Sequence, residues 1–414
     1  MELVESLNRT LKLALDQGKA ASVVEAEALF RSFHVQIVVG AEVAENRALQ
    51  AALLTLLNAA PRTFHGEVTV TGELDFKFLI GWHRGEPLCA VVATYGARCS
   101  TVARDRLSVL LGCRDRGELT HPFAIHLACS RTGFTLSPEP VNLSETTASP
   151  VAGVAGAGAA LNECFQFLYF GRVWAGQRVV EFDLPSLEMP ARDVRSLWAI
   201  GLGHLGQAVF WTMATCWDFK TPTPVLKLQD YDRISKSSLS TGLLTRIDDV
   251  GSLKVDVVAR EMSKMGFGCE PVPELLYLGG GLRASTEACV VTVDNLNFRR
   301  QLDKLYGARI FEAGIGDGPS GFTKCQFHVL PGQRAAADIW AEGDPRASKP
   351  VQISAPAYQK ILGETGDECG TTQLAGRSVA TQFVGAFAGA VLFSALMSGS
   401  AGGEDSIGID VNAL

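Results

Sequence analysis

Several features that would identify a simple functional class are missing from this sequence. Its ten cysteines are scattered and no two form a C-x-x-C pair, so neither a zinc site nor a disulfide framework is indicated. No apolar run reaches the roughly 20 residues of a membrane span; residues 379–397 come nearest, but their polar, glycine and alanine residues are typical of a packed globular helix. The beginning of the sequence lacks the pattern of a signal peptide. A protein of the reducing cytoplasm is therefore expected.

An excess of positive charge is also missing. The formal net charge is −7 and no basic block offsets it, which argues against a nucleic-acid partner or a membrane-surface partner. The 414 residues suffice for two domains with full cores. The 42 glycines fit close packing of helices on sheets, so we predict an α/β protein.

The most informative stretch begins at residue 197. Four apolar residues are followed by Gly201-Leu202-Gly203-His204-Leu205-Gly206 and a second apolar run. This order predicts a buried strand, a tight glycine turn and the start of a helix. Glycines let the backbone approach a phosphate closely, and the amides that begin a helix attract the anion. We therefore predict a nucleotide-binding turn at these three glycines.

Charged residues follow the next two strands that the pattern predicts. One strand leads to Asp230 and Asp232, and the other leads to Asp294 and Asn295. An acidic residue at the tip of the second strand of such a sheet is placed to bind a ribose. Lys254 lies between the two strands in the sequence. A nucleotide site with a lysine and a strand-end carboxylate suggests nucleotidyl transfer rather than hydride transfer.

The first half of the chain has a similar rhythm without the glycine cluster. After one helix predicted over residues 2–33, a strand ends at Gly40 and a helix follows, which we interpret as a mononucleotide fold without its nucleotide. The expected elements of this half are a strand over 35–40, a helix over 44–57, a strand over 88–94, a helix over 101–111, a strand over 123–129, a helix over 151–169 and a strand over 179–184.

Both halves end with an Ala/Gly-rich helix and a closing strand, which favours an internal duplication, with chance similarity as the alternative. Residues 185–190 are interpreted as the linker. The predicted units are an N-terminal helical segment 1–34, a degenerate domain 35–190 and an active domain 191–414 with a crossover segment at about 331–377.

The second half resembles the adenylation domain of ThiF, MoeB and the ubiquitin-activating enzymes. The motifs that carry the resemblance, through their order and spacing, are the glycine turn, Asp230-Tyr231-Asp232, Leu244 to Lys254, Asp294-Asn295 with Arg299, and Phe311-Glu312-Ala313-Gly314 before Gly321. The resemblance implies two Rossmann-like ThiF-type halves that form a pseudo-dimer, the first degenerate and the second active.

The resemblance also implies a role for each matching residue. The turn at Gly201 holds the ATP phosphates, Asp230 binds the ribose, Lys254 reaches the phosphate charge and Asp294 ligates Mg²⁺. Such groups are needed because a carboxylate attacking an α-phosphate brings two anions together. The alternatives are that Lys254 is a solvated lysine and that Asp294 only caps a helix.

One part of the family pattern is absent. The usual Ser-Asn-Leu-x-Arg is replaced by Ser237-Ser238-Leu239-Ser240-Thr241, so the amide and the arginine of the standard phosphate contact are missing. Arg246 lies where ubiquitin-activating members also carry arginine. Arg9 is the second candidate, because relatives often borrow an arginine from the neighbouring subunit or inactive half.

Family members that form a thioester carry a cysteine in the crossover segment, where Cys369 is the only cysteine here. An exposed loop thiol can act as a nucleophile, although the adjacent Asp367 and Glu368 disfavour the thiolate. We expect Cys289 and Cys325 to be core residues. His204 and His328 have no partner at ligand spacing, so both are interpreted as structural.

The expected function is ATP-dependent activation of a ubiquitin-like protein at its C-terminal carboxylate, then thioester formation and transfer to a conjugating (E2-like) enzyme. The compact plan, too short for a large cysteine domain and a ubiquitin-fold domain, resembles bacterial activating enzymes of ubiquitin-like conjugation operons, including antiphage ones. A homodimer is left open. The alternatives are a ThiF/MoeB-type adenylyltransferase for a sulfur carrier, an NAD(P) oxidoreductase, and a scaffold with a decayed site, which Ser238 and Thr241 motivate.

Overall fold

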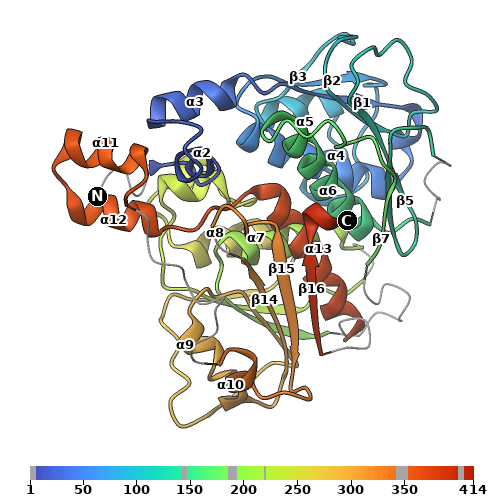
Figure 1. Cartoon of the computed structure of the whole chain (residues 1–414). Coiled ribbons are helices and arrows are strands. Elements are labelled where there is room, and N and C mark those ends of the chain that lie inside the picture. Colours follow the sequence, from blue (N-terminus) through green and yellow to red (C-terminus); the bar gives the residue numbers. More distant parts are fainter. Residues whose placement is uncertain are drawn as a thin grey trace.

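The computed structural model describes residues 6–141, 147–184, 194–218, 221–316, 318–341, 353–399 and 405–414. Two seven-stranded mixed sheets form its framework (Figure 1). In each sheet the first four pairings are parallel and the last two are antiparallel.

The sheet of the first half has the order β3-β2-β1-β4-β5-β6-β7. Its strands and the helices around it are β1 Val35–Val39, α4 Arg47–Thr63, β2 Val68–Gly72, α5 Leu88–Thr94, β3 Arg98–Cys99, β4 Ser108–Leu111, β5 Ala124–Cys129, β6 Gly133–Ser137, α6 Pro150–Leu168 and β7 Val180–Asp183. Two helices, α2 Leu11–Asp16 and α3 Val23–Arg31, precede it.

The sheet of the second half has the order β10-β9-β8-β12-β14-β15-β16. Its main elements are β8 Ser196–Ile200, α7 His204–Cys216, β9 Val225–Gln229, α8 Lys254–Lys264, β10 Cys269–Val272, β12 Ala288–Val291, α9 Leu296–Arg299, β14 Arg309–Ile315, β15 Lys324–Leu330, α10 Ala336–Ile339, α11 Pro356–Thr365, α12 Glu368–Gly376, α13 Gln382–Ser398 and β16 Ser406–Asp410. The strands β11 Leu282–Arg283 and β13 Leu305–Tyr306 form a separate two-stranded sheet.

Strand for strand, the two sheets have the same order and the same directions, so the two Rossmann-like halves expected from the sequence are confirmed. The central parallel strands are apolar runs buried on both faces, as in β4 and β12, because helices cover each side of such a sheet. The predicted linker 185–190 lies outside the described residues.

Four helices, α4, α6, α13 and α7, lie between the two sheets (Figure 1). Their backbones approach closely at small residues. A Cβ atom added to Gly153 of α6 would lie 2.0 Å from the carbonyl oxygen of Ala48 in α4. A Cβ atom on Gly158 of the same helix would lie 2.5 Å from the carbonyl oxygen of Phe383 in α13. The Ala/Gly-rich sequences of α6 and α13 are therefore explained by close helix contacts, with α4 and α7 inside each half and between α6 and α13 across the halves.

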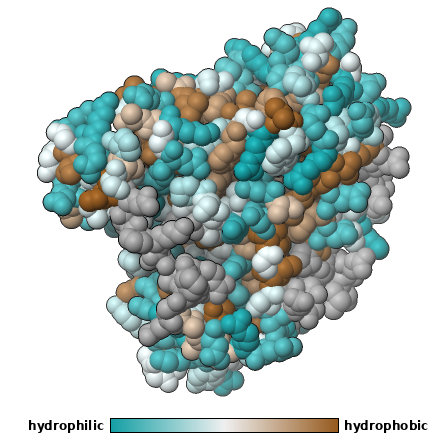
Figure 2. All heavy atoms as spheres, in the orientation of Figure 1, coloured by the Kyte–Doolittle hydropathy of each residue, from teal (hydrophilic) through white to brown (hydrophobic). Residues whose placement is uncertain are grey.

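These buried helices account for the most apolar stretches of the chain. Helix α13 is buried along nearly its whole length. Among the described helices, none is long and apolar enough to cross a bilayer. On the face drawn in Figure 2, hydrophilic residues predominate and apolar residues lie in narrow bands. The apolar helix faces are thus used inside the molecule.

Several predicted elements were wrong. Residues 88–94 form helix α5, not a strand, because burial of Leu88, Val91 and Val92 follows a helical period. The helix expected over 101–111 is absent there, and its last four residues form the buried strand β4. The single helix predicted over residues 2–33 is broken in the described part of that stretch, where α2 and α3 are separate helices. The described part of the crossover segment holds three helices, α10, α11 and α12.

The close approach of α6 and α13 is testable by Gly158→Val. The added side chain should separate the two helices and lower the free energy of unfolding by about 2 kcal/mol or more, as overpacking does in a dense core. Urea denaturation measures this change. Gly363→Ala is the matched control, because Gly363 lies on the exposed side of α11 with nothing within 4 Å of an added Cβ; it should be neutral or slightly stabilising. Equal effects of the two variants would contradict the packing described.

Candidate functional site

A cavity of about 1340 Å³ lies at the carboxyl ends of β8, β9 and β12. Strand β8 has β9 on one side and β12 on the other, so the order of the strands reverses at this point. In open α/β sheets the ligand crevice forms at such a switch point. The cavity therefore lies where the fold itself favours ligand binding.

The glycine turn forms the floor of this cavity. Gly201 follows β8 with φ of +89°, a conformation that favours glycine. A Cβ atom on Gly206 would lie 2.2 Å from the carbonyl oxygen of Gly201, so Gly206 permits the close return of α7. Gly203 lines the cavity with open space beside it. Helix α7 begins directly after it at His204, which directs free backbone amides toward the cavity.

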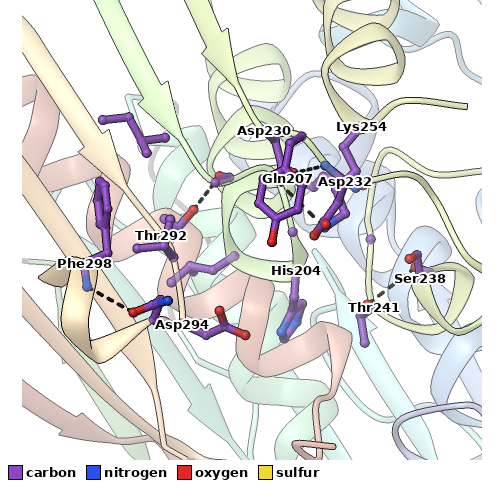
Figure 3. Close-up of a pocket in the computed structure, with 18 of the residues that line it drawn as sticks. His204, Gln207, Asp230, Asp232, Ser238, Thr241, Lys254, Thr292, Asp294 and Phe298 are labelled. Atoms are coloured by element: carbon purple, nitrogen blue, oxygen red, sulfur yellow. Dashed lines mark hydrogen bonds and ion pairs between the residues drawn. The ribbon is translucent and has the colours of Figure 1, made fainter. Parts of the chain in front are cut away.

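Asp230, Asp232 and Lys254 form one connected group beside the turn (Figure 3). The Asp230 carboxylate accepts hydrogen bonds from the amides of Leu202 at 2.7 Å and Asp232 at 2.8 Å. The Lys254 ammonium lies 2.7 Å from the Asp232 carboxylate and 3.8 Å from that of Asp230. Burial raises the pKa of Asp230, and the nearby Lys254 charge opposes that shift.

Asp294 and Asn295 line the cavity just after β12, and Figure 3 shows Asp294 there. The cap of α9 is Asn295, whose side-chain oxygen accepts from the Phe298 amide at 3.0 Å. The alternative that Asp294 caps this helix is therefore wrong. The Asp294 carboxylate is exposed and lies in the cavity wall. Thr292, just before it, donates to the Gly201 carbonyl at 2.7 Å, which holds β12 against the turn.

No cluster of three potential metal ligands occurs among the described residues. Mg²⁺ is commonly bound by only one or two carboxylates together with substrate phosphates and water. A single exposed carboxylate beside the phosphate-binding turn, as Asp294 provides, fits that donor set. The residues present therefore suit a metal that arrives with a nucleotide rather than a resident metal.

Two segments that are distant in the sequence, around Arg9 and around Arg377, also line the cavity. Arg9, just before α2, donates to the Ser378 hydroxyl at 2.8 Å and carbonyl at 3.3 Å, and its backbone amide donates to the Ser240 hydroxyl at 3.0 Å. Arg377 lines the same cavity and donates to the Ser237 hydroxyl at 3.0 Å. Sequence reasoning missed Arg377, because no local motif marks a residue that only tertiary folding brings here.

Two predicted residues lie apart from the cavity. Arg246 lines a separate cavity of about 400 Å³ with Trp82, Tyr95 and Trp211, so the structure does not bring it to the glycine turn. Cys369 is exposed on α12 and does not line the large cavity. It lies in a helix, not in the loop that the sequence suggested.

For two further cysteines and two histidines, the sequence predicted structural roles. Cys289 and Cys325 are buried, as expected. The Nδ1 atom of His328 lies 2.8 Å from the Ser406 hydroxyl across β15 and β16. The His204 ring packs against Gly385 of α13, and its Nε2 is buried without a hydrogen-bond partner in the described part of the chain. His328 thus has structural surroundings, whereas His204 both packs on α13 and lines the large cavity.

A residue of the first half holds in place a segment of the second half that lines the cavity. The half-buried Arg62 of α4 donates to the carbonyls of Leu239 and Gly242 at 2.8 and 2.7 Å and of Thr245 at 3.0 Å. Thr241 and Gly242 of this segment line the large cavity. The first half therefore holds one wall of the cavity in place.

The strand registers show which residues of the first half stand at the positions that line the cavity in the second. By these registers Asp230 corresponds to Glu73 and Asp294 corresponds to Arg114, and the start of α8 at Lys254 corresponds to Leu88 at the start of α5. The first half thus has an acidic residue at the position of Asp230, an apolar residue at that of Lys254 and a cation at that of Asp294. In addition, α4 begins only at Arg47, after a 3₁₀ helix that separates it from Gly40.

Three comparisons place the chain among known proteins. Residues 34–184 match the family described as the BilD N-terminal domain and residues 194–403 match the BilD C-terminal domain. The bacterial E1-like protein BilD of Collimonas sp. (strain OK412) is 33% identical over 415 residues, which cover 96% of this chain and 89% of that protein.

Solved structures of E. coli MccB are also similar, at 15% identity and a TM-score of 0.34. The match covers 52% of this chain and 59% of the MccB chain. For the structure titled MccB with ATP, it covers 53% of this chain and 61% of that chain.

His204, whose Nε2 atom is buried, predicts a specific pH dependence of stability. Burial lowers its pKa from 6.5 to about 4, so between these values the unfolded chain binds more protons than the folded one. Stability should therefore fall as the pH drops from 7 to 5, by about 2 kcal/mol from this residue. Urea denaturation of wild type and His204→Gln at both pH values isolates that share. An equal loss in both proteins would show that His204 is not held neutral.

Proposed function

The chain belongs to the BilD family of bacterial E1-like proteins, and from this premise we propose that it activates a ubiquitin-like protein by adenylating its C-terminal carboxylate with ATP. The observation that carries the proposal is the convergence of the glycine turn, Asp230, Lys254 and Asp294 on one cavity. These groups match the parts of a nucleoside triphosphate in chemistry and in order.

In this proposal the nucleotide lies along the carboxyl ends of β9, β8 and β12. The Asp230 carboxylate, fixed by two backbone amides, accepts hydrogen bonds from the ribose hydroxyls. The free amides at the start of α7 and the Lys254 ammonium bind the phosphates. Lys254 begins with a carboxylate partner at 2.7 Å, so it is already oriented when the phosphates arrive.

The reaction is an attack on the α-phosphorus. A carboxylate oxygen of the carrier protein forms the new P–O bond, the bond to the β-phosphate breaks, and pyrophosphate leaves. Two anions must approach each other, so the rate depends on nearby positive charge. Lys254 and Arg9 supply it from the chain, and Asp294 would hold a Mg²⁺ ion, which would screen the charge of the phosphate oxygens. The role predicted for Arg246 is not carried further, because this residue faces the other cavity.

A second step is proposed at Cys369. Its thiolate attacks the acyl-adenylate, the thioester C–S bond forms and AMP leaves. The acyl group then passes to a cysteine of a conjugating enzyme. Exposure of Cys369 supports access by a second protein. A sulfur-carrier adenylyltransferase that stops at the acyl-adenylate is the alternative, and the position of Cys369 outside the cavity favours it. The antiphage role, the cytoplasmic location and the homodimer stay predictions.

ATP–pyrophosphate exchange tests the first step. Wild type should exchange label only in the presence of a ubiquitin-like protein with a free C-terminal carboxylate, and Asp294→Ala or Lys254→Ala should reduce the rate on the order of a hundredfold or more. Asp248→Asn is the matched control, because Asp248 is exposed beside the smaller cavity. Unchanged exchange in either site variant would contradict the proposed roles.

Thioester formation is tested separately by Cys369→Ser. With ATP and the carrier, wild type should form a covalent adduct that a thiol reductant cleaves, while the variant keeps pyrophosphate exchange and forms no adduct. Cys89→Ser removes another exposed cysteine and should leave the adduct intact. An adduct that persists in Cys369→Ser would assign the nucleophile elsewhere, and its absence in wild type would favour the enzyme that stops at the adenylate.

A further inference from the structure

Positive charge in the large cavity comes from several segments. The cationic residues that line it are Arg9, Arg233, Lys236, Lys254, Arg299 and Arg377. Two of them are committed to carboxylates: Lys254 pairs with Asp232 at 2.7 Å, and Arg299 pairs with the buried Glu312 at 3.0 Å. The exposed Arg233 donates to the Gly251 carbonyl. The remaining cations are therefore the ones to consider for phosphate oxygens.

Arg377 differs from the others in its surroundings. It is half-buried, lines the cavity and makes one side-chain hydrogen bond, 3.0 Å from its Nη1 to the Ser237 hydroxyl. No carboxylate pairs with it in the described part of the chain. A guanidinium with one neutral partner keeps donors available for a phosphate, which it can bind in a bidentate manner.

The contact with Ser237 also places Arg377 at the gap in the family pattern. Ser237 belongs to the 3₁₀ helix Lys236–Ser240, which ends at Thr241. Thr241 stands where the arginine of that pattern is missing, and its own hydroxyl turns back toward the Ser238 carbonyl. Arg377 therefore brings a guanidinium to the segment that lacks one.

Arg377 is also the residue at which α12 ends. This helix carries Cys369 near its other end, so the thiol and the guanidinium are separated by roughly 12 Å along the helix axis at 1.5 Å per residue. The next residue, Ser378, holds Arg9, and Thr10 donates to the Ala380 carbonyl at 3.1 Å. The end of α12 is thus joined to both the cavity wall and the N-terminal segment.

We propose that Arg377 binds the ATP phosphates in place of the arginine missing at position 241, and that this contact fixes the end of the helix that carries Cys369. The inference rests on the proposed function, since it needs ATP in this cavity. It adds a regulatory consequence: phosphate occupancy orders α12, and departure of pyrophosphate releases that restraint before the thiol has to act.

Hydrogen exchange with the full chain and ATP–Mg²⁺, without a carrier protein, tests both parts. ATP should slow amide exchange over residues 368–376 in wild type. Arg377→Gln should abolish that protection and raise the ATP concentration at half-saturation by roughly ten- to a hundredfold, the loss expected for one charge-assisted hydrogen bond. Arg377→Lys keeps the charge and should restore part of both effects. Arg246→Gln, at the smaller cavity, is the matched control and should resemble wild type.

The outcomes separate this inference from the proposed function. If wild type binds no ATP, both fall. If wild type binds ATP and Arg377→Gln binds it equally well, the phosphate contact is wrong while adenylation stands. If ATP does not alter exchange in α12 of the wild type, the coupling to Cys369 is wrong. Melting temperatures of all variants without nucleotide guard against misfolding, and Arg377→Lys provides the test if the glutamine variant is unstable.

Discussion

The structure depends on the packing of four small-residue helices between two sheets. Helices α4 and α6 of the first half meet α13 and α7 of the second. Gly158 allows near contact of the α6 and α13 backbones across the halves, and Gly153 allows it between α6 and α4 inside the first half. A close-packed interior tolerates little extra volume, so this interface fixes how the halves face each other. Everything that the first half contributes to the cavity, including Arg62 and the segment that carries Arg9, depends on that fixed orientation.

The two halves have the same topology but carry different residues at the equivalent positions. The second half keeps the open glycine turn and the charges that a nucleotide needs. The first half has an arginine at 114 and a leucine at 88 in the equivalent places, yet its half-buried Arg62 donates to three carbonyls of the second half. These hydrogen bonds satisfy the donors of a partly buried guanidinium and link the cavity wall to the first half.

The sequence predicted the parts of the site that local order determines. The turn at Gly201, Asp230 and Asp294 each follow a strand of one parallel sheet, so their meeting at one edge follows from topology. Arg377 could not be found in this way, because helix packing brings it from 83 residues beyond Asp294. The sequence placed Arg246 in the wrong cavity, because a motif does not show in which direction a side chain points. Residues 88–94 were read as a strand because a short apolar run suits either structure.

The central claim is that one of two equivalent folds holds the nucleotide. Calorimetric titration of the full chain with ATP–Mg²⁺ tests it most directly, using wild type and Lys254→Met. The account predicts one ATP bound per chain and loss of that binding in the variant. Two ATP molecules per chain would show that the first half is not degenerate, and binding that survives in Lys254→Met, or none in wild type, would contradict the site described.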